Sequence, residues 1–112
     1  MQVRYFKKIF DQATAAATSD TVVNLYSDTL SVQLEGTFTS ISFKVLGKTT
    51  MESDEFIELS GINLNTFDVA NPLTAKGVYE FPVEGICILK FQIASISGGN
   101  VTANVRLVST GD

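Results

Sequence analysis

Five runs of this chain alternate apolar and polar residues with a period of two. In the first run, Val32 and Leu34 are separated by Gln33. Successive side chains of an extended strand point to opposite faces, so each run has one apolar and one polar face. Strands of this kind are typical of antiparallel sheets with one buried face. The apolar positions of the other runs are Ile41, Phe43 and Val45; Tyr79, Phe81 and Val83; Leu89, Phe91 and Ile93; and Val101, Ala103, Val105 and Leu107.

Turn signals separate these runs at short intervals. The polar stretch 49–55 indicates an exposed hairpin loop, and Ser97-Gly98-Gly99-Asn100 is typical of a tight hairpin turn. Short strands with turns at this spacing predict an all-β fold, an antiparallel two-sheet β-sandwich or jelly roll with seven to nine short strands. No linker interrupts the pattern, so we expect residues 1–112 to form a single domain.

Residues 1–20 allow two interpretations. The alanines within 7–17 tolerate a short helix, whereas Tyr5, Ile9 and their apolar neighbours suit an extended segment. We favour a strand over about residues 3–11 followed by a loop. This N-terminal strand or arm would then be available for contacts with another chain.

Composition excludes several classes of function. The chain has no histidine and one cysteine, so it lacks a Ser-His-Asp or Cys-His nucleophile system, a histidine-containing zinc site and an internal disulfide. Its net charge of −4 argues against binding to nucleic-acid phosphates. No apolar run is long enough for a membrane span. We therefore expect a protein that is not an enzyme and that binds no cofactor, nucleic acid or membrane.

Charge is distributed unevenly along the chain. Arg4, Lys7 and Lys8 form a basic N-terminal end. They could guard a terminal strand edge against unwanted pairing, or they could dock onto an acidic partner such as the outside of a shell protein. The acidic cluster at 52–58 lacks the register of an EF-hand, and its simplest interpretation is a solvated loop.

Residues 8–110 carry a family resemblance, most clearly in the second half of the chain. The segment Leu73–Tyr79, the turn Val83-Glu84-Gly85 and the hairpin Ser97-Gly98-Gly99 form a recognisable sequence. It resembles small β-sandwich virion proteins of tailed bacteriophages and prophages, of the head fibre, head decoration or minor tail type. One departure is Phe56, which stands where such sequences usually have Trp; it would preserve a core aromatic without the indole N–H donor.

The resemblance implies a structural virion protein, made in the bacterial host cytoplasm and attached to the head or tail as a decoration or fibre component. Its expected partners are further copies of itself, with a trimer favoured, and the major capsid or tail protein. Contacts between copies would add stability that a small core cannot supply. The candidate docking and oligomer contacts are Arg4, Tyr5, Phe6, Lys7, Lys8, Phe10, Ile86, Ile88 and Ile96.

A carbohydrate-binding, host-adhesion module is the alternative. Such a module would expose an aromatic platform, for which Tyr5, Tyr26 and Tyr79 are the candidates. The chain has no tryptophan, and no sequence motif supports glycan binding.

Overall fold

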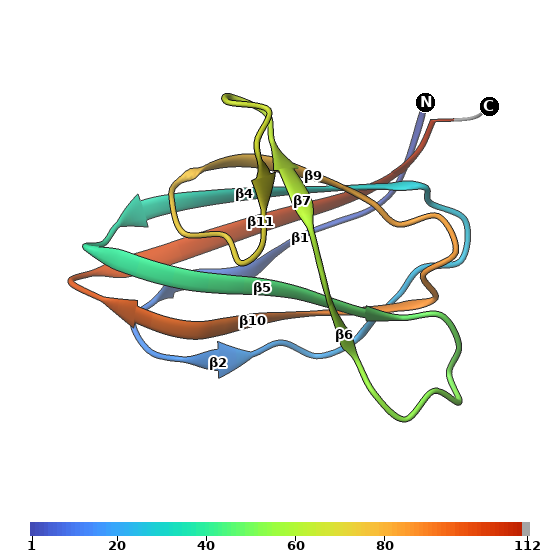
Figure 1. The fold of residues 1–112 in the computed structure, drawn as a ribbon, viewed down its shortest axis with the longest axis horizontal. Helices are drawn as coiled ribbons and strands as arrows, with labels where there is room; N and C mark the ends of the chain where they lie inside the picture. Colours follow the sequence, from blue (N-terminus) through green and yellow to red (C-terminus); the bar gives the residue numbers. More distant parts are fainter. Residues whose placement is uncertain (111–112) are drawn as a thin grey trace.

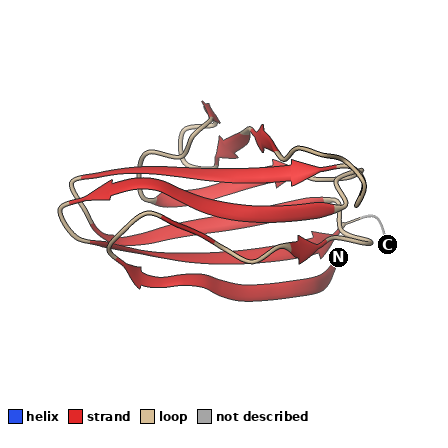
Figure 2. Cartoon of the chain, turned by 90° about the horizontal axis from the view of Figure 1, so that it is seen from below, coloured by secondary structure: helices blue, strands red, loops and turns tan. Residues whose placement is uncertain are grey.

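The computed structural model describes residues 1–110, which form two antiparallel sheets packed face to face and, within that range, no helix (Figures 1 and 2). No helix that could cross a membrane is therefore found in this part of the chain. The strands are β1 (Gln2–Ala13), β2 (Ala17–Thr18), β3 (Val22–Val23), β4 (Thr29–Thr37), β5 (Ser40–Lys48), β6 (Ile57–Leu59), β7 (Gly61–Asn63), β8 (Val69–Ala70), β9 (Gly77–Pro82), β10 (Ile88–Ser97) and β11 (Asn100–Ser109).

The two sheets confirm the predicted sandwich class. One sheet has six strands in the order β1-β11-β4-β9-β7-β8. The other has five, in the order β2-β10-β5-β6, with β3 also paired to β10. The strand number exceeds the predicted seven to nine because β2, β3, β6, β7 and β8 are only two or three residues long. Strands this short carry no alternation that a sequence pattern could detect.

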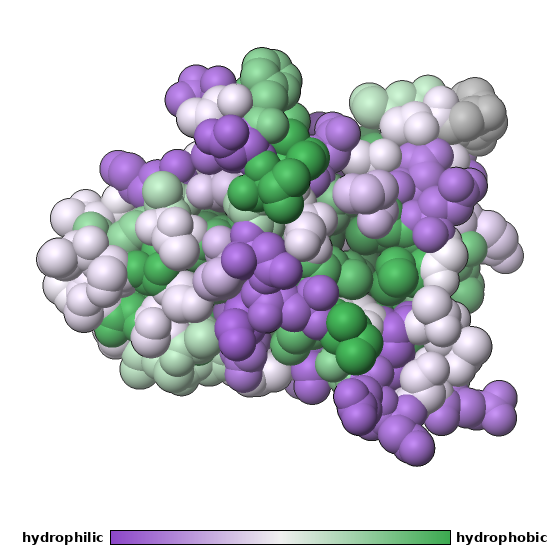
Figure 3. All heavy atoms as spheres, viewed as in Figure 1, coloured by the Kyte–Doolittle hydropathy of each residue, from purple (hydrophilic) through white to green (hydrophobic). Residues whose placement is uncertain are grey.

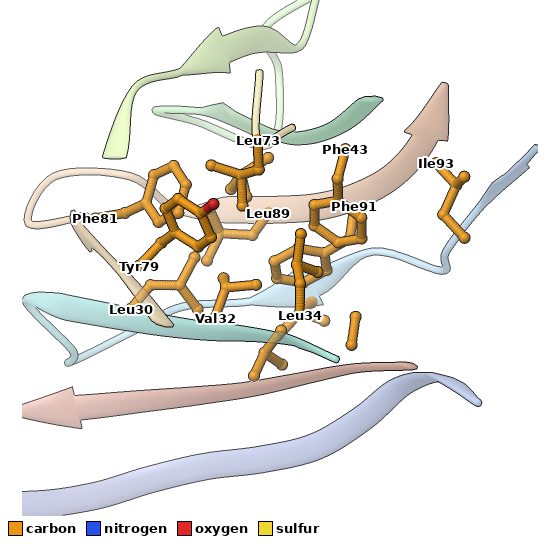
Figure 4. Close-up of a cluster of buried hydrophobic side chains, with 14 of the residues drawn as sticks. Leu30, Val32, Leu34, Phe43, Leu73, Tyr79, Phe81, Leu89, Phe91 and Ile93 are labelled. Atoms are coloured by element: carbon orange, nitrogen blue, oxygen red, sulfur yellow. The ribbon is translucent and has the colours of Figure 1, made fainter. Parts of the chain in front are cut away.

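Every apolar position of the five alternating runs is buried between the sheets, at 4% exposure or less. Figure 4 shows side chains of both sheets meeting there, with Leu30, Val32 and Leu34 on one side and Phe43 and Phe91 on the other. This layer removes a large apolar area from water, which is the main favourable contribution to folding.

The first strand is longer than predicted and irregular. β1 covers the expected range 3–11 and pairs with β11 along its length, with three shifts of register. At the last of these, Gln12 adopts a positive φ of 53° and its N–H donates to the Thr102 hydroxyl at 3.0 Å. Thr102 is therefore 9% exposed, although the alternation assigned it to the solvated face.

The hairpin turn at 97–100 is confirmed. β10 ends at Ser97 and β11 begins at Asn100, and the two glycines between them both have positive φ. A Cβ at Gly99 would collide with the carbonyl oxygen of Thr37. Glycine is required there because the backbone of the neighbouring β4–β5 hairpin leaves no room for a side chain.

Residues 49–56 form the expected exposed loop, between β5 and β6, but its aromatic residue differs from the prediction. Phe56 is half-buried and lies outside the core between the sheets. Its ring lies 4.8 Å from the ammonium of Lys48 and 4.2 Å from that of Lys90. An aromatic ring attracts cations over its face, so Phe56 anchors this loop rather than filling the core.

Candidate functional site: a basic groove on the six-stranded sheet

The outer face of the six-stranded sheet brings together residues from four strands. Register places Phe6 of β1 opposite Arg106 of β11, which in turn lies opposite Ser31 of β4. The next row places Lys8 opposite Asn104. Residues opposite one another in adjacent strands share a face, so both rows point away from the core. The second row continues from Asn104 through Gln33 and Val78.

A surface groove of about 600 Å³ lies over these rows. This volume is within the range of about 300–1,000 Å³ that is usual for ligand sites. We call it the basic groove. Its lining residues are Val3, Phe6, Lys7, Lys8, Ser31, Gln33, Val78, Asn104, Val105 and Arg106.

The basic groove concentrates positive charge in a protein of net charge −4. Within residues 1–110, Lys7 and Arg106 make no ion pair, and no carboxylate lines the groove. Lys8 lies 4.0 Å from Asp11, but both side chains are more than half exposed and such pairs contribute little. Lys7 lies opposite Val105, whose side chain is buried on the inner face, so it points away from the two outer rows and also lines a second pocket with Asp20. The groove therefore offers two cationic groups, Lys8 and Arg106, to a ligand.

Carboxylates bound the groove on two sides. Glu80 of β9 lies opposite Ser31 on the same outer face. Glu35 of β4 accepts a hydrogen bond from the Asn104 side-chain amide at 2.9 Å. The cations come from β1 and β11, so the positive side of the groove lies next to the sheet edge and the opposite side is bounded by Glu80.

The outermost strand β1 is protected against pairing through its backbone. It is an edge strand of twelve residues, which is long enough to template another chain. Its three register shifts and the exposed Lys7 and Lys8 are the features that discourage such edge-to-edge pairing. A partner would therefore meet the side chains of the groove more readily than the backbone of β1.

Phe6 and Lys8 lie on the outer face in the basic groove, and Lys7 between them lines the groove from the other face of β1. The structure places the other N-terminal candidates elsewhere. Phe6 is 77% exposed. Arg4 is exposed, and its guanidinium lies 5.6 Å from the ring centre of Tyr26, outside the groove. Tyr5 and Phe10 are half-buried against the core. The Phe10 ring meets that of Phe43 edge-on at 6.0 Å.

The three isoleucine candidates lie elsewhere. Ile86 and Ile96 are half-buried and pack against the core. Ile88 is 4% exposed, so its side chain is not available at the surface of a single chain. These three were candidates because the sequence left open which way their apolar side chains face.

The tyrosine candidates for a glycan platform differ in their exposure to solvent. Tyr79 is 2% exposed and donates a hydrogen bond to the carbonyl oxygen of Ala75 at 2.8 Å, so it cannot stack on a ligand. Burial raises the pKa of Tyr79 above its ordinary value. Tyr26 is 72% exposed.

Sequence reasoning did not single out the partners of β1 in the groove, which are Arg106, Asn104, Gln33 and Val78. The available signal was their place in the alternating runs, where all but Val78 occupy the polar positions. That signal shows that they face outward, but the order of strands in the sheet is needed to place them beside Lys8. Along the chain, residue 8 and residue 104 are far apart.

The chemistry of the groove suits binding of an anionic group beside an apolar surface. Lysine and arginine supply the charge, whereas Phe6 and Val78 supply the apolar surface. In the part of the chain that the structure describes, no three His, Cys, Asp or Glu side chains are grouped to hold a metal ion.

Known proteins of similar sequence or structure share this fold. The XepA family model matches residues 5–106. The crystal structure of the SPBc2 prophage-derived protein YomS superposes with a TM-score of 0.81 at 24% identity, covering 94% of this chain and 92% of that one. The crystal structure of the PBSX exported protein XepA superposes with a TM-score of 0.85 at 21% identity, covering 94% of this chain.

The match to the exported protein XepA extends over 37% of that protein, so this chain corresponds to about a third of its length. No curated protein sequence matches the chain significantly. The resemblance to small β-sandwich proteins of phages and prophages is confirmed by the family match and by the prophage origin of YomS. With nearly the whole of its sequence matched by the family model, the chain belongs to the XepA family.

Proposed function

We propose that this protein is a non-enzymatic, oligomeric structural component of a phage particle, a decoration or fibre component on the head or tail. The basic groove is the observation that carries this proposal. An acidic protein that gathers Lys8 and Arg106 beside the exposed Phe6 has a surface suited to a protein partner with carboxylates. Arginine and aromatic residues are enriched where proteins meet.

The phage affiliation of the fold supports the location in the proposal. YomS is prophage-derived, and its fold matches this chain over nearly the full length of both. The core between the sheets consists of apolar side chains, and the groove holds no nucleophile paired with a base, which supports a structural role.

The first experiment is to measure the mass of the purified protein over a range of concentrations by size-exclusion chromatography with light scattering. We expect a defined multimer, with a trimer as the stoichiometry predicted from sequence. A strict monomer at the highest concentration would contradict the oligomeric part of the proposal.

Docking to a particle needs a second measurement. Phage particles that lack the protein are mixed with it, sedimented and tested for bound protein. Wild-type protein should sediment with heads or tails, and Lys76→Gln should behave in the same way because Lys76 is exposed outside the groove. Absence of binding to both particle parts would refute attachment to the virion.

A host-adhesion function is a second candidate, favoured by one observation, the 72% exposure of Tyr26. One face of this ring is already occupied by the Arg4 guanidinium, which leaves the other face for a sugar. Glycan-array binding that disappears in Tyr26→Ala and persists in Tyr79→Phe would support this function. An array with no binding would reject it.

A further inference from the structure

We propose that the basic groove of one copy receives the β5–β6 loop of a second copy, so that copies assemble head to tail. This inference rests on the oligomeric part of the proposed function and names the two surfaces that meet. The loop comprises residues 49–56, between Lys48 and Ile57.

The loop carries the charge that the groove lacks. Glu52, Asp54 and Glu55 are exposed, and within residues 1–110 none of them makes an ion pair. These carboxylates are opposite in sign to Lys8 and Arg106, the cations on the outer rows of the groove. The loop extends beyond the sandwich in Figure 1, and hydrophilic side chains cluster at this corner in Figure 3.

The apolar parts of the two surfaces also correspond. Met51 is 63% exposed at the tip of the loop, beside the carboxylates. In the groove, Phe6 and Val78 are exposed by 77% and 41%, on either side of the polar rows. A flexible thioether side chain adapts to such a surface, and sulfur makes favourable contacts with aromatic rings.

The loop is held in shape before any partner arrives. The Lys48 ammonium donates to the carbonyl oxygens of Met51 at 3.4 Å and Ser53 at 3.1 Å. Phe56 anchors the other end of the loop between the ammonium groups of Lys48 and Lys90. A loop that is already ordered loses less conformational entropy when it binds, so more of its contact energy appears as affinity.

The two surfaces lie on different sheets, and this determines the type of assembly. The loop connects strands of the five-stranded sheet, whereas the groove lies on the outer face of the six-stranded sheet. No residue of 49–56 lines the groove of its own chain. In a head-to-tail assembly each copy gives one loop and receives another, so the contact is heterologous and produces a closed ring or an open filament.

The experiment uses two variants of the full chain. The loop variant carries Glu52→Gln, Asp54→Asn and Glu55→Gln, and the groove variant carries Lys8→Gln and Arg106→Gln. Each alone should associate at least about tenfold more weakly than wild type, because each removes the charges of one side and close charge pairs at interfaces couple strongly. Circular dichroism checks that both remain folded. The matched control neutralises the exposed carboxylates outside the loop, with Asp20→Asn, Asp68→Asn and Glu84→Gln, and should assemble as wild type does.

Mixing the two variants gives the decisive measurement. The intact groove of the loop variant can receive the intact loop of the groove variant, but the resulting pair has no further working surface. Light scattering of the equimolar mixture should therefore show a one-to-one dimer and nothing larger. Reversing the charges on both surfaces of one chain, with Glu52→Lys, Asp54→Lys, Glu55→Lys, Lys8→Glu and Arg106→Glu, should restore assembly of the wild-type size.

Other outcomes separate this inference from the proposed function. A wild-type multimer that neither variant weakens would overturn the groove–loop contact and leave the oligomeric proposal standing. A wild-type monomer would overturn both. A monomer that binds an acidic polysaccharide such as alginate, and loses that binding in the groove variant, would assign the groove to a polyanion instead of a second copy.

Discussion

The two faces of the six-stranded sheet are built from the same strands, but different physical constraints act on their residues. On β4, Val32 and Leu34 are 2% exposed or less, whereas Gln33 between them is exposed. On β11, Val105 and Leu107 are buried and Arg106 is exposed. The inner face must fill the space against the other sheet, so its residues are restricted in polarity and volume. The outer face has no such restriction, and its residues can serve contacts with other molecules.

The largest expected effect tests the inner face. Leu34→Ala should destabilise the protein by about 2–5 kcal/mol, because it removes buried methyl groups and leaves a cavity that the surroundings fill only in part. Chemical denaturation followed by circular dichroism measures the loss. A change below about 1 kcal/mol would show that this face is loosely packed and would weaken the comparison.

A buried polar residue directly after β3 tests how much a hydrogen-bonded side chain outside the apolar core contributes to stability. Asn24 is 7% exposed, and its side-chain amide donates to the carbonyl oxygens of Ser27, Val83 and Ile86 at 3.0–3.2 Å. Asn24→Ala leaves these buried groups without their partner and should cost about 1–3 kcal/mol. The same denaturation measurement applies, and Asn65→Ala in the exposed β7–β8 turn serves as the comparison.

Substitutions on the outer face should have a much smaller effect on stability. Gln33→Ala and Arg106→Ala should each change the free energy of unfolding by no more than about 0.5 kcal/mol, since exposed side chains away from caps and strained backbone contribute little. Gln33 is adjacent to the buried Leu34, and Arg106 is adjacent to the buried Val105. Each substitution therefore tests the outer face of a strand whose inner face carries a core residue. A loss above about 1.5 kcal/mol in either variant would remove the distinction between the faces.

The smallest effect concerns pH. Hydrogen bonds from Thr110 and Thr29 lower the pKa of Asp28 below its ordinary value of 3.8. The unfolded chain therefore binds this proton more tightly than the folded one, so the stabilisation is present above about pH 4 and is lost as pH falls through the lower pKa. In Asp28→Asn, melting temperature should decline less than in wild type between pH 4 and pH 2. Parallel declines in the two proteins would show that this carboxylate is not a source of acid sensitivity.

Prediction from sequence worked best where burial controls the pattern. Every apolar position of the five runs, from Val32 to Leu107, is in the core because the period of two leaves only one arrangement of faces. The pattern failed for Phe56, which has cations around it instead of core neighbours. It also failed for Thr102, where an irregularity in β1 covers a residue that alternation had placed in solvent.

The candidate site was predicted only in part. Phe6, Lys7 and Lys8 were identified because basic and aromatic residues are concentrated near the N-terminus. Arg4 belongs to the same short segment, but its side chain lies beside Tyr26 and not in the groove. The register of β1 shifts at this point, between Val3 and Tyr5. Irregularities of this kind change the face to which a side chain points, and single-sequence patterns do not reveal them.

The sequence by itself determined the all-β class, the hairpin at Gly98-Gly99 and the inner faces of the main strands, because these depend on local backbone freedom and on a short repeating pattern. Tertiary structure alone decided that β1 pairs with β11 and that β11 pairs with β4. That order places Lys8 and Arg106 over one groove and leaves the acidic loop on the other sheet. Strand order depends on the packing of the whole chain. It brings together residues that are far apart in sequence, and no local pattern indicates that they will be neighbours.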